Sequence, residues 1–245
     1  MHPTKGLVVL ALSMLCLARP ATAETPRAEY VRPITSDNAA VLFIDNQTNL
    51  MLGVQSIDTT LLRINTEGLA QLAKIFSLPV VLTTTGGGAN GPAGRLVPSI
   101  TQAFPDVPVI DRTDYFNAMS DPRFARAVKD TKRTKIIIAG LTTDYCLVYP
   151  AATLIAQGYH VFIVTDASGS WTAQNDQTAM QRLIQMGATP INLQSLMGEL
   201  QNSDAEKDLA ASKRKFPLML EWFSRYSPAP SILNMNMAPR GVERR

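Results

Sequence analysis

The stretch from residue 135 to residue 158, KIIIAGLTTDYCLVYPAATLIAQG, limits what this chain can fold into more than any other part of the sequence. Ile136 to Ile138 form a β-branched, wholly apolar run, which is typical of a strand buried on both faces of a parallel sheet. After a short polar link, apolar residues recur at helical spacing up to Gly158, a residue type that ends helices. A buried strand followed at once by a helix indicates an α/β fold with a parallel sheet.

Cys146 lies in the first turn of the helix that this pattern predicts. The unpaired N–H groups and the positive end of the helix dipole favour an anion at that position, so the placement would activate a thiolate. The alternative interpretation is a small buried apolar residue that packs at a helix start. The position alone leaves both interpretations open.

The same alternation of strand and helix runs along most of the chain. Apolar runs predict strands at 39–44, 79–84, 107–110, 160–164 and 190–193, and helical patterns lie at 57–76, 121–131 and 174–186. Ligands of such parallel sheets bind outside the carboxyl ends of the strands. Because Asp45, Arg112 and Cys146 each follow the end of a predicted strand, we expect the three side chains at one rim of the sheet.

Residues 1–23 have the pattern of a secretory signal peptide. Lys5 supplies the basic start, an apolar run covers residues 6–17, and the sequence ATA at residues 21–23 matches a cleavage site. The apolar run is too short to span a bilayer. We therefore expect an exported protein, periplasmic or secreted, without a membrane partner; an uncleaved anchor or a buried N-terminal helix is the alternative.

Cleavage would leave a nearly neutral chain with one thiol. It would remove two positive charges, those of Lys5 and Arg19, from a formal net charge of +3, which argues against a nucleic-acid partner. Cys146 would remain without a disulfide partner, and a lone thiol in an exported protein is a candidate for reactivity. With His160 as the one remaining histidine and no cysteine cluster, we expect no metal site.

The length of 245 residues suits one sizeable α/β domain. Residues 24–38 are polar and broken by prolines, which indicates an N-terminal arm. We assign the domain to residues 39–200 and a C-terminal helical arm and tail to residues 201–245. The tail is expected to be loose or to clasp a partner.

A glycine-rich segment at residues 86–91 satisfies the G-x-G-x-x-G pattern of dinucleotide sites, with Asp111 about twenty residues further on. That fingerprint depends on a helix N-terminus that holds the pyrophosphate. Pro92 and Pro98 leave little room for such a helix. We therefore interpret the segment as a rim loop or a plain turn and expect no cofactor.

Two residues after the fifth predicted strand, Ser168 and Trp171, are candidates for a catalytic or pocket-lining role. Ser168 has no G-x-S-x-G elbow around it and no histidine base, so serine catalysis is not expected. Trp171 either lines a pocket or serves simple packing.

Three segments carry a family resemblance: AAVLFIDNQ, DRTDYFNAMSDPRFARAVK, and IIIAGLTTDYCLVYPAATLIAQGYHVFIVTDASG. Over residues 38–200 the chain resembles the isochorismatase-like cysteine hydrolases, most closely the YcaC-like branch. The resemblance implies a Rossmann-like three-layer α-β-α sandwich with a six-stranded parallel sheet of order 3-2-1-4-5-6. It also implies a homo-oligomer.

By the same resemblance, the catalytic triad falls on Asp45, Arg112 and Cys146. The family's cis peptide would join Leu141 and Thr142. The backbone N–H groups of Thr142 and Cys146 would then form the oxyanion hole.

The chain departs from the family pattern at the basic position, which is Arg112 and not Lys. Arginine can stabilise a thiolate or orient a carboxylate, but its pKa is too high for useful proton donation. Acid–base work would then rest on Asp45 alone. The alternative for Arg112 is a surface salt bridge with a neighbouring aspartate such as Asp111.

A second departure concerns the substrate pocket. Asn117 and Ala118 are followed by Met119, where the family has a tryptophan. We keep Asn117 and Trp171 as substrate-binding candidates, but the sequence names no particular substrate.

The expected function is a cofactor-free cysteine hydrolase that cleaves a small amide or related C–N bond through a thioester on Cys146. A second hypothesis is a catalytically silent ring-forming or small-ligand-binding member of the same fold. A third is a thiol sensor that would form a stable sulfenic acid on Cys146.

Overall fold

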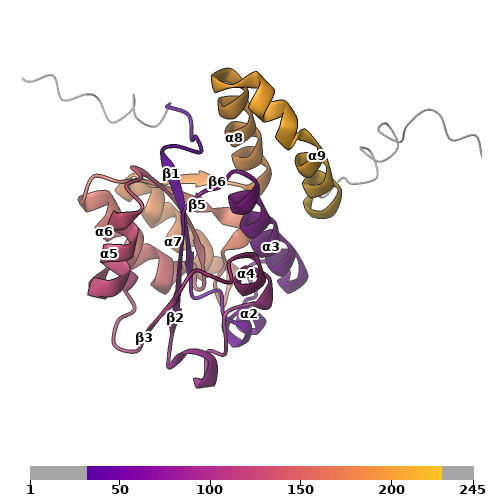
Figure 1. The fold of residues 1–245 in the computed structure, drawn as a ribbon. Helices are drawn as coiled ribbons and strands as arrows, with labels where there is room; N and C mark the ends of the chain where they lie inside the picture. Colours follow the sequence, from indigo (N-terminus) through magenta and orange to yellow (C-terminus); the bar gives the residue numbers. More distant parts are fainter. Residues whose placement is uncertain (1–31, 228–245) are drawn as a thin grey trace, which may run out of the picture.

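The computed structural model of the chain describes residues 32–227. Six parallel strands form one sheet in the order β3-β2-β1-β4-β5-β6, with helices on both faces (Figure 1). The strands are β1 (Ala39–Ile44), β2 (Val80–Thr85), β3 (Val109–Arg112), β4 (Lys135–Gly140), β5 (His160–Val164) and β6 (Thr189–Ile191). The predicted three-layer α/β fold and its strand order are confirmed.

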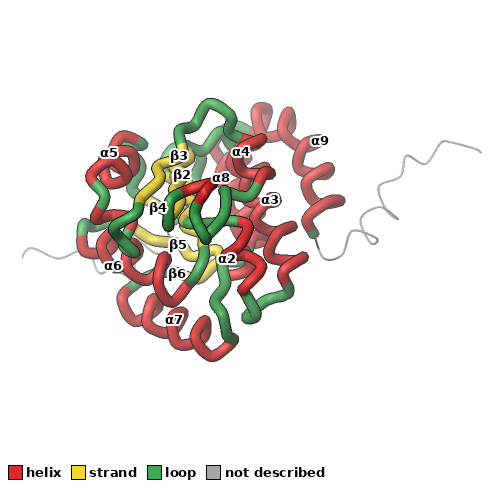
Figure 2. The backbone as a smooth tube through the Cα atoms, turned by 90° about the horizontal axis from the view of Figure 1, so that it is seen from below, coloured by secondary structure: helices red, strands yellow, loops and turns green. Residues whose placement is uncertain are grey.

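The helices fall into two groups, one on each face of the sheet. They are α2 (Thr48–Gly53), α3 (Thr59–Ile75), α4 (Pro98–Ala103), α5 (Pro122–Asp130), α6 (Val148–Ala156), α7 (Ala173–Met186), α8 (Leu193–Lys207) and α9 (Leu209–Tyr226). Short turns of helix are η1 (Gly88–Asn90), η2 (Ala118–Ser120), η3 (Thr143–Leu147) and η4 (Thr165–Ala167). Figure 2 shows α5, α6 and α7 on one side of the sheet and α3, α4 and α9 on the other.

β1 lies at the centre of the sheet because its side chains are apolar on both faces, and all of them are buried. Val41 and Phe43 belong to the core shared with α3, α8 and α9. Leu42 and Ile44 belong to the core shared with α5, α6 and α7. The carboxyl end of this doubly buried strand is therefore enclosed by packed layers, and the next residue is Asp45.

Local signals explain where two of the helices begin. Asp121 caps α5 by accepting a hydrogen bond from the Arg123 backbone N–H at 2.8 Å, and Pro122 occupies the first helical position. Thr172 caps α7 through a hydrogen bond from the Asn175 backbone N–H at 3.1 Å. These caps confirm the predicted helix at 121–131 and place the start of α7 one residue earlier than predicted.

Two strand boundaries and one short helix differ from the sequence prediction in ways that have a clear local cause or bear on the site. β3 includes Arg112, because Thr85 of β2 pairs with it in the sheet. The short helix α2 was not predicted. β6 ends at Ile191, where a strand was expected to continue, because the Asn192 side chain caps α8 by accepting from the Ser195 N–H at 2.8 Å.

The predicted C-terminal arm is helical, and its helices pack into the core. Trp222 of α9 is buried in the same cluster as Phe43 of β1, and its indole N–H donates to the Gly68 carbonyl of α3 at 2.8 Å. The proposed domain boundary at residue 200 falls inside α8. The predicted signal peptide and the tail beyond residue 227 lie outside the described residues.

The N-terminal segment also contacts the C-terminal helices, at α8. Ile34 is fully buried, and its backbone N–H donates to the Glu199 carboxylate of α8 at 2.6 Å. The described part of the predicted N-terminal arm is therefore anchored to the domain.

Candidate active site

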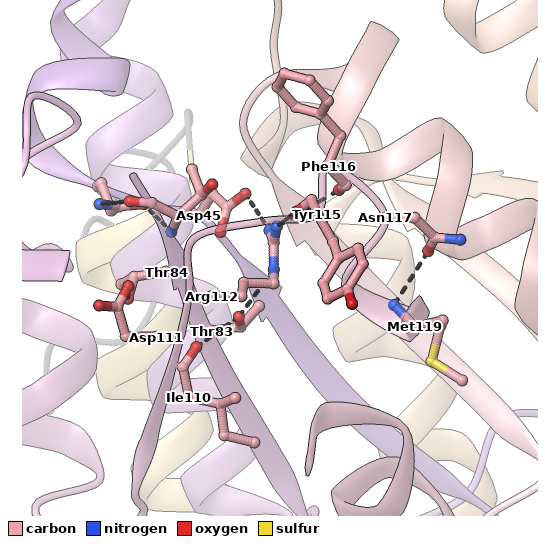
Figure 3. Close-up of polar contacts among 12 residues, drawn as sticks. Asp45, Thr83, Thr84, Ile110, Asp111, Arg112, Tyr115, Phe116, Asn117 and Met119 are labelled. Atoms are coloured by element: carbon pink, nitrogen blue, oxygen red, sulfur yellow. Dashed lines mark hydrogen bonds and ion pairs between the residues drawn. The ribbon is translucent and has the colours of Figure 1, made fainter. Parts of the chain in front are cut away.

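The carboxyl ends of three strands bring Asp45, Arg112 and Cys146 to one edge of the sheet. Asp45 directly follows β1, Arg112 is the last residue of β3, and Cys146 lies in η3 beyond β4. β2 lies between β1 and β3, so the Arg112 side chain reaches Asp45 past Thr83 of β2 (Figure 3). The three side chains therefore lie at one rim of the sheet, as the sequence predicted.

Asp45 is fully buried and adopts a left-handed backbone conformation, with a φ of 55°. This conformation breaks the strand alternation and re-aims the side chain at the end of β1. Its Oδ2 accepts a hydrogen bond from Arg112 Nη2, and its Oδ1 has no hydrogen-bond partner of good geometry among the described residues. The Cys146 thiol nevertheless lies close enough to act on the pKa of the carboxyl as a hydrogen-bond donor.

Arg112 is 1 % exposed, and its donors are largely used within the protein. Nε donates to Thr83 Oγ1 at 3.1 Å, and Nη1 donates to the Tyr115 carbonyl at 2.6 Å. Figure 3 shows the guanidinium between Asp45 and the Tyr115–Phe116 segment. The predicted alternative of a surface salt bridge is wrong, because the guanidinium is buried and pairs with Asp45.

Cys146 is 6 % exposed and lies in η3, one residue before the last residue of that turn. η3 is a π-helical turn that runs directly into α6 at Val148, so Cys146 lies in the first helical turn after β4, as predicted, and that turn is π-helical. Burial and the negative charge of Asp45 raise the pKa of the Cys146 thiol, while Arg112 and the backbone N–H of Thr142 lower it. The net effect is a raised pKa, which favours the protonated thiol in the free protein and opposes the activation that a helix start alone would give.

Burial also raises the pKa of Asp45, to about 6, although the charge of Arg112 and hydrogen bonds from Cys146 and Arg112 act in the opposite direction. Desolvation disfavours the charged form of both the acid and the thiol. The pair therefore holds one proton on sulfur near neutral pH, with a carboxylate beside it that can receive that proton.

The turn between β4 and η3 contains a cis peptide bond between Leu141 and Thr142, as the resemblance implied. Leu141 N–H donates to the Ile44 carbonyl at 3.0 Å, which continues the sheet past the end of β4. Gly140 is required there, because a Cβ would lie 2.1 Å from the Ile44 carbonyl oxygen. The Thr142 N–H lies close enough to the Cys146 sulfur to lower the pKa of the thiol as a hydrogen-bond donor.

The two substrate-binding candidates have structural contacts of their own. The Asn117 amide accepts from the Met119 N–H at 3.0 Å and donates to Thr153 Oγ1 at 2.9 Å. The Trp171 ring packs so closely on Gly53 that a Cβ there would lie 2.5 Å from it. A role in substrate binding stays a prediction for both.

The glycine-rich segment is not followed by a helix. Gly86 and Gly88 both have left-handed φ values, of 69° and 61°, and the chain passes through η1 before α4 starts at Pro98. The segment lines a cavity of about 620 Å³ together with Asp111. The arrangement lacks the helix N-terminus that a dinucleotide fingerprint uses.

Sequence reasoning missed several residues of the site. Thr83 and the Tyr115 carbonyl hold Arg112, but neither a strand threonine nor a backbone carbonyl has a sequence signature. Asn46 is fully buried, and neither polar atom of its amide has a hydrogen-bond partner within residues 32–227. An unpaired buried amide is costly, so Asn46, next to Asp45, is a further candidate for contact with a substrate.

The described residues contain neither a group of metal ligands nor a helix suited to a membrane. Within residues 32–227 no group of three or more His, Cys, Asp or Glu side chains is arranged to hold a metal ion. In the same range, no helix is both long and apolar enough to cross a membrane.

Comparison with known proteins decides the family. The Isochorismatase domain model matches residues 39–195, which is more than half of the chain. The chain belongs to the isochorismatase family. The match spans the six strands and includes Asp45, Arg112 and Cys146.

Within the isochorismatase family, the chain lies in the YcaC-like branch. It is 42 % identical over 159 residues to the probable hydrolase YcaC of Escherichia coli, covering 65 % of this chain and 75 % of that protein. It is 26 % identical over 165 residues to the secreted isochorismatase effector Isc1 of Phytophthora sojae, covering 67 % of this chain and 78 % of that protein.

Solved structures give the same placement. The YcaC gene product of Escherichia coli, an octameric hydrolase of unknown specificity, superposes with a TM-score of 0.75 at 35 % identity, covering 84 % of this chain and 96 % of that chain. YcaC of Pseudomonas aeruginosa, solved with hexane-2,5-diol and covalent acrylamide, gives a TM-score of 0.75 at 32 % identity, covering 84 % of this chain and 97 % of that chain. The chain is therefore an isochorismatase-family member with a hydrolase fold of the YcaC type.

Proposed function

We propose that this chain is a cysteine hydrolase that cleaves a small amide or related C–N bond through a thioester on Cys146. The observation that carries the proposal is the buried Asp45 carboxyl, which pairs with the Arg112 guanidinium and lies close enough to the Cys146 thiol for each group to act on the other's pKa. The covalent acrylamide in the Pseudomonas aeruginosa relative supports a reactive nucleophile in that protein, because acrylamide is an electrophile that alkylates thiols.

The first half-reaction forms the thioester. The Cys146 thiol gives its proton to Asp45 as sulfur attacks the amide carbon, so proton transfer and attack are coupled and no free thiolate is needed beforehand. The N–H groups of Thr142 and Cys146 hold the oxyanion. One donor of this kind typically stabilises the transition state by about 3 kcal/mol. When the C–N bond breaks, the leaving amine takes the proton from Asp45.

The second half-reaction hydrolyses the thioester. Asp45, again a carboxylate, takes a proton from a water molecule as the water oxygen attacks the thioester carbon. The C–S bond then breaks, the carboxylic acid leaves, and the sulfur recovers a proton from Asp45. Every proton is carried by Asp45, which suits a carboxyl whose pKa is about 6.

Arg112 has a positioning role in this proposal. Its contacts with Asp45, Thr83 and the Tyr115 carbonyl hold the guanidinium in place. It keeps Oδ2 of Asp45 occupied, which leaves Oδ1 for the proton transfers. Arginine stays protonated throughout, so it takes no part as an acid.

Removal of the nucleophile tests the proposal. We expect Cys146→Ala to lose amide turnover by a factor on the order of 10⁶, because the thioester cannot form. The measurement is a screen of small amides for amine or ammonia release, with circular dichroism to check that the variant is folded. Cys146→Ala at full activity would end this mechanism.

A thiol-labelling series separates the roles within the site. Alkylation of Cys146 by iodoacetamide or acrylamide is followed against pH, with Asp45→Asn and Arg112→Ala beside the wild type. Because Cys16 is a second thiol when residues 1–23 are present, labelling is read on the peptide that contains Cys146. Identical profiles in the three proteins would show an ordinary thiol and contradict the proposal.

A second candidate function is small-ligand binding without turnover. The observation that favours it is the buried guanidinium of Arg112, whose donors are largely used within the protein, where the resemblance expects a lysine. Saturable binding of small carboxylates or amides, with no product after long incubation, would favour this function over hydrolysis.

Assembly and location are proposals as well. We infer a homo-oligomer, supported by the octameric state of the Escherichia coli relative. We also infer export, supported by the signal-peptide pattern at residues 1–23.

A further inference from the structure

The first turn of α7 is joined to η3, the turn that carries Cys146, by two hydrogen bonds between side chains. Thr143 Oγ1 donates to Asp176 Oδ1 at 2.6 Å. Asn175 Nδ2 donates to Asp144 Oδ2 at 3.2 Å. The two bonds link consecutive residues of η3 to consecutive residues of α7, so they form a clasp between these elements.

The bond between Thr143 and Asp176 is the strong member of the clasp. Thr143 is fully buried, and a hydroxyl that donates to a carboxylate at this length is a charge-assisted hydrogen bond. The fully buried Ser170 directs its hydroxyl to the same carboxylate oxygen at 3.4 Å. The bond between Asn175 and Asp144 is exposed, and we expect it to contribute little.

The clasp fixes the part of η3 that holds the reacting groups. The Thr143 backbone N–H donates to the Gly169 carbonyl at 3.0 Å, so Thr143 is held by its main chain on one side and by Asp176 on the other. The backbone N–H of its neighbour Thr142 lies close enough to the Cys146 sulfur to lower the pKa of the thiol. A shift of Thr143 would move that N–H relative to the sulfur.

We propose that Asp176 is a positioning residue of this active site, which acts through Thr143 to hold the Thr142 N–H and the Cys146 sulfur toward the same point. The proposal rests on the proposed hydrolase function for its kinetic consequence. Asp176 touches neither substrate nor sulfur in this role. Its carboxylate is the acceptor that keeps η3 in register with α7.

Substitutions at both ends of the bond test the proposal. Thr143→Val removes the hydroxyl with little change of shape, and Asp176→Ala removes the acceptor. We expect each to lower kcat by about 10- to 100-fold with little change in KM, since small misplacements of reacting groups cost rates of this size. The double variant should be no worse than either single one, because both remove the same bond.

Conservative variants and a matched control keep the test decisive. Thr143→Ser retains the hydroxyl and Asp176→Asn retains an oxygen acceptor, so both should recover most of the lost rate. Gln177→Ala changes the next, exposed residue of α7 and should behave as the wild type. Asp176→Ala at the rate of Gln177→Ala, or fully additive losses in the double variant, would overturn the proposal.

The rate of Cys146 alkylation by iodoacetamide measures the effect of the clasp on the thiol without any substrate. Loss of the Thr142 contact should slow labelling and move its pH profile upward in Thr143→Val and Asp176→Ala, but not in Gln177→Ala. If the wild type turns over no amide while the profile still moves, the hydrolase proposal fails and the role of Asp176 stands. An unchanged profile in folded variants would overturn the role of Asp176 and leave the hydrolase proposal untouched.

Discussion

At the scale of single residues, burial decides the protonation of the site. Cys146 lies at the start of a helix, where the helix dipole by itself would lower the pKa of a thiol. In the structure, removal from water and the Asp45 carboxylate outweigh that effect and raise the pKa instead. The raised pKa therefore favours the protonated thiol of Cys146 in the folded protein.

The raised pKa of Asp45 predicts a specific dependence of stability on pH. Because the pKa is 3.8 for the exposed group and about 6 in the folded protein, the folded state binds the proton more tightly. The contribution of Asp45 to the free energy of unfolding should be full below about pH 4 and lost as the pH rises through about 6. The difference of about two units between the two pKa values corresponds to ~3 kcal/mol in the free energy of unfolding.

Denaturant unfolding of the wild type and Asp45→Asn between pH 4 and pH 7 measures this contribution. Asparagine does not titrate, so the gap in unfolding free energy between the two proteins should shift by that amount across the window. A constant gap would show that the pKa of Asp45 is the same in the folded and unfolded chains. If Asp45 is the base, kcat/KM should also fall as the pH drops below about 6.

At the scale of elements, the packing of the C-terminal helices α8 and α9 into the core is the main feature that the sequence did not reveal. Beyond residue 201 the sequence pattern weakens and predicts a helical arm, without showing what that arm packs against. In the structure, α9 lies against α3, and the buried Trp222 joins the core of the sheet through its ring and the Gly68 carbonyl through its N–H. Tyr226 adds a hydrogen bond to Glu67 at 2.9 Å.

Truncation of Trp222 should therefore destabilise the whole domain. We expect Trp222→Ala to lower the free energy of unfolding by about 3–5 kcal/mol, because it removes a large buried ring from a packed core. Trp222→Phe keeps most of the ring and loses the bond to Gly68, so its cost should be smaller. Phe216→Ala, at a side chain of the same helix that is 45 % exposed, is the matched control. Equal unfolding midpoints for Trp222→Ala and Phe216→Ala would show that α9 is not part of the cooperative core.

At the scale of the whole molecule, the sheet order explains the site. β1 and β4 are neighbours at the centre, and β3 is the edge strand two places from β1. A long side chain is therefore needed at the end of β3 to reach Asp45, and Arg112 has that length. The same order places Cys146, which follows β4, on the other side of Asp45.

The predicted signal peptide belongs to this scale, and it is tested on the full chain. When residues 1–23 are expressed with the rest in a bacterium, we expect the mature protein to begin at Glu24 in the exported fraction, because the ATA sequence precedes it. N-terminal sequencing and fractionation measure this. A chain that starts at Glu24 by construction should stay in the cytoplasm. An intact N-terminus in the cytoplasmic fraction of the full-length protein would contradict the proposal.

The sequence by itself determined the alternation of strands and helices, the helix start at Asp121, and the rim on which Asp45, Arg112 and Cys146 meet. These features follow from local periodicity and from the geometry of parallel sheets, in which all carboxyl ends share one edge. The tertiary structure alone decided the protonation of Cys146 and Asp45, the hold of Thr83 on Arg112, the clasp at Asp176 and the packing of Trp222. Each of these depends on desolvation or on contacts between residues far apart in the chain, and no local pattern carries that information.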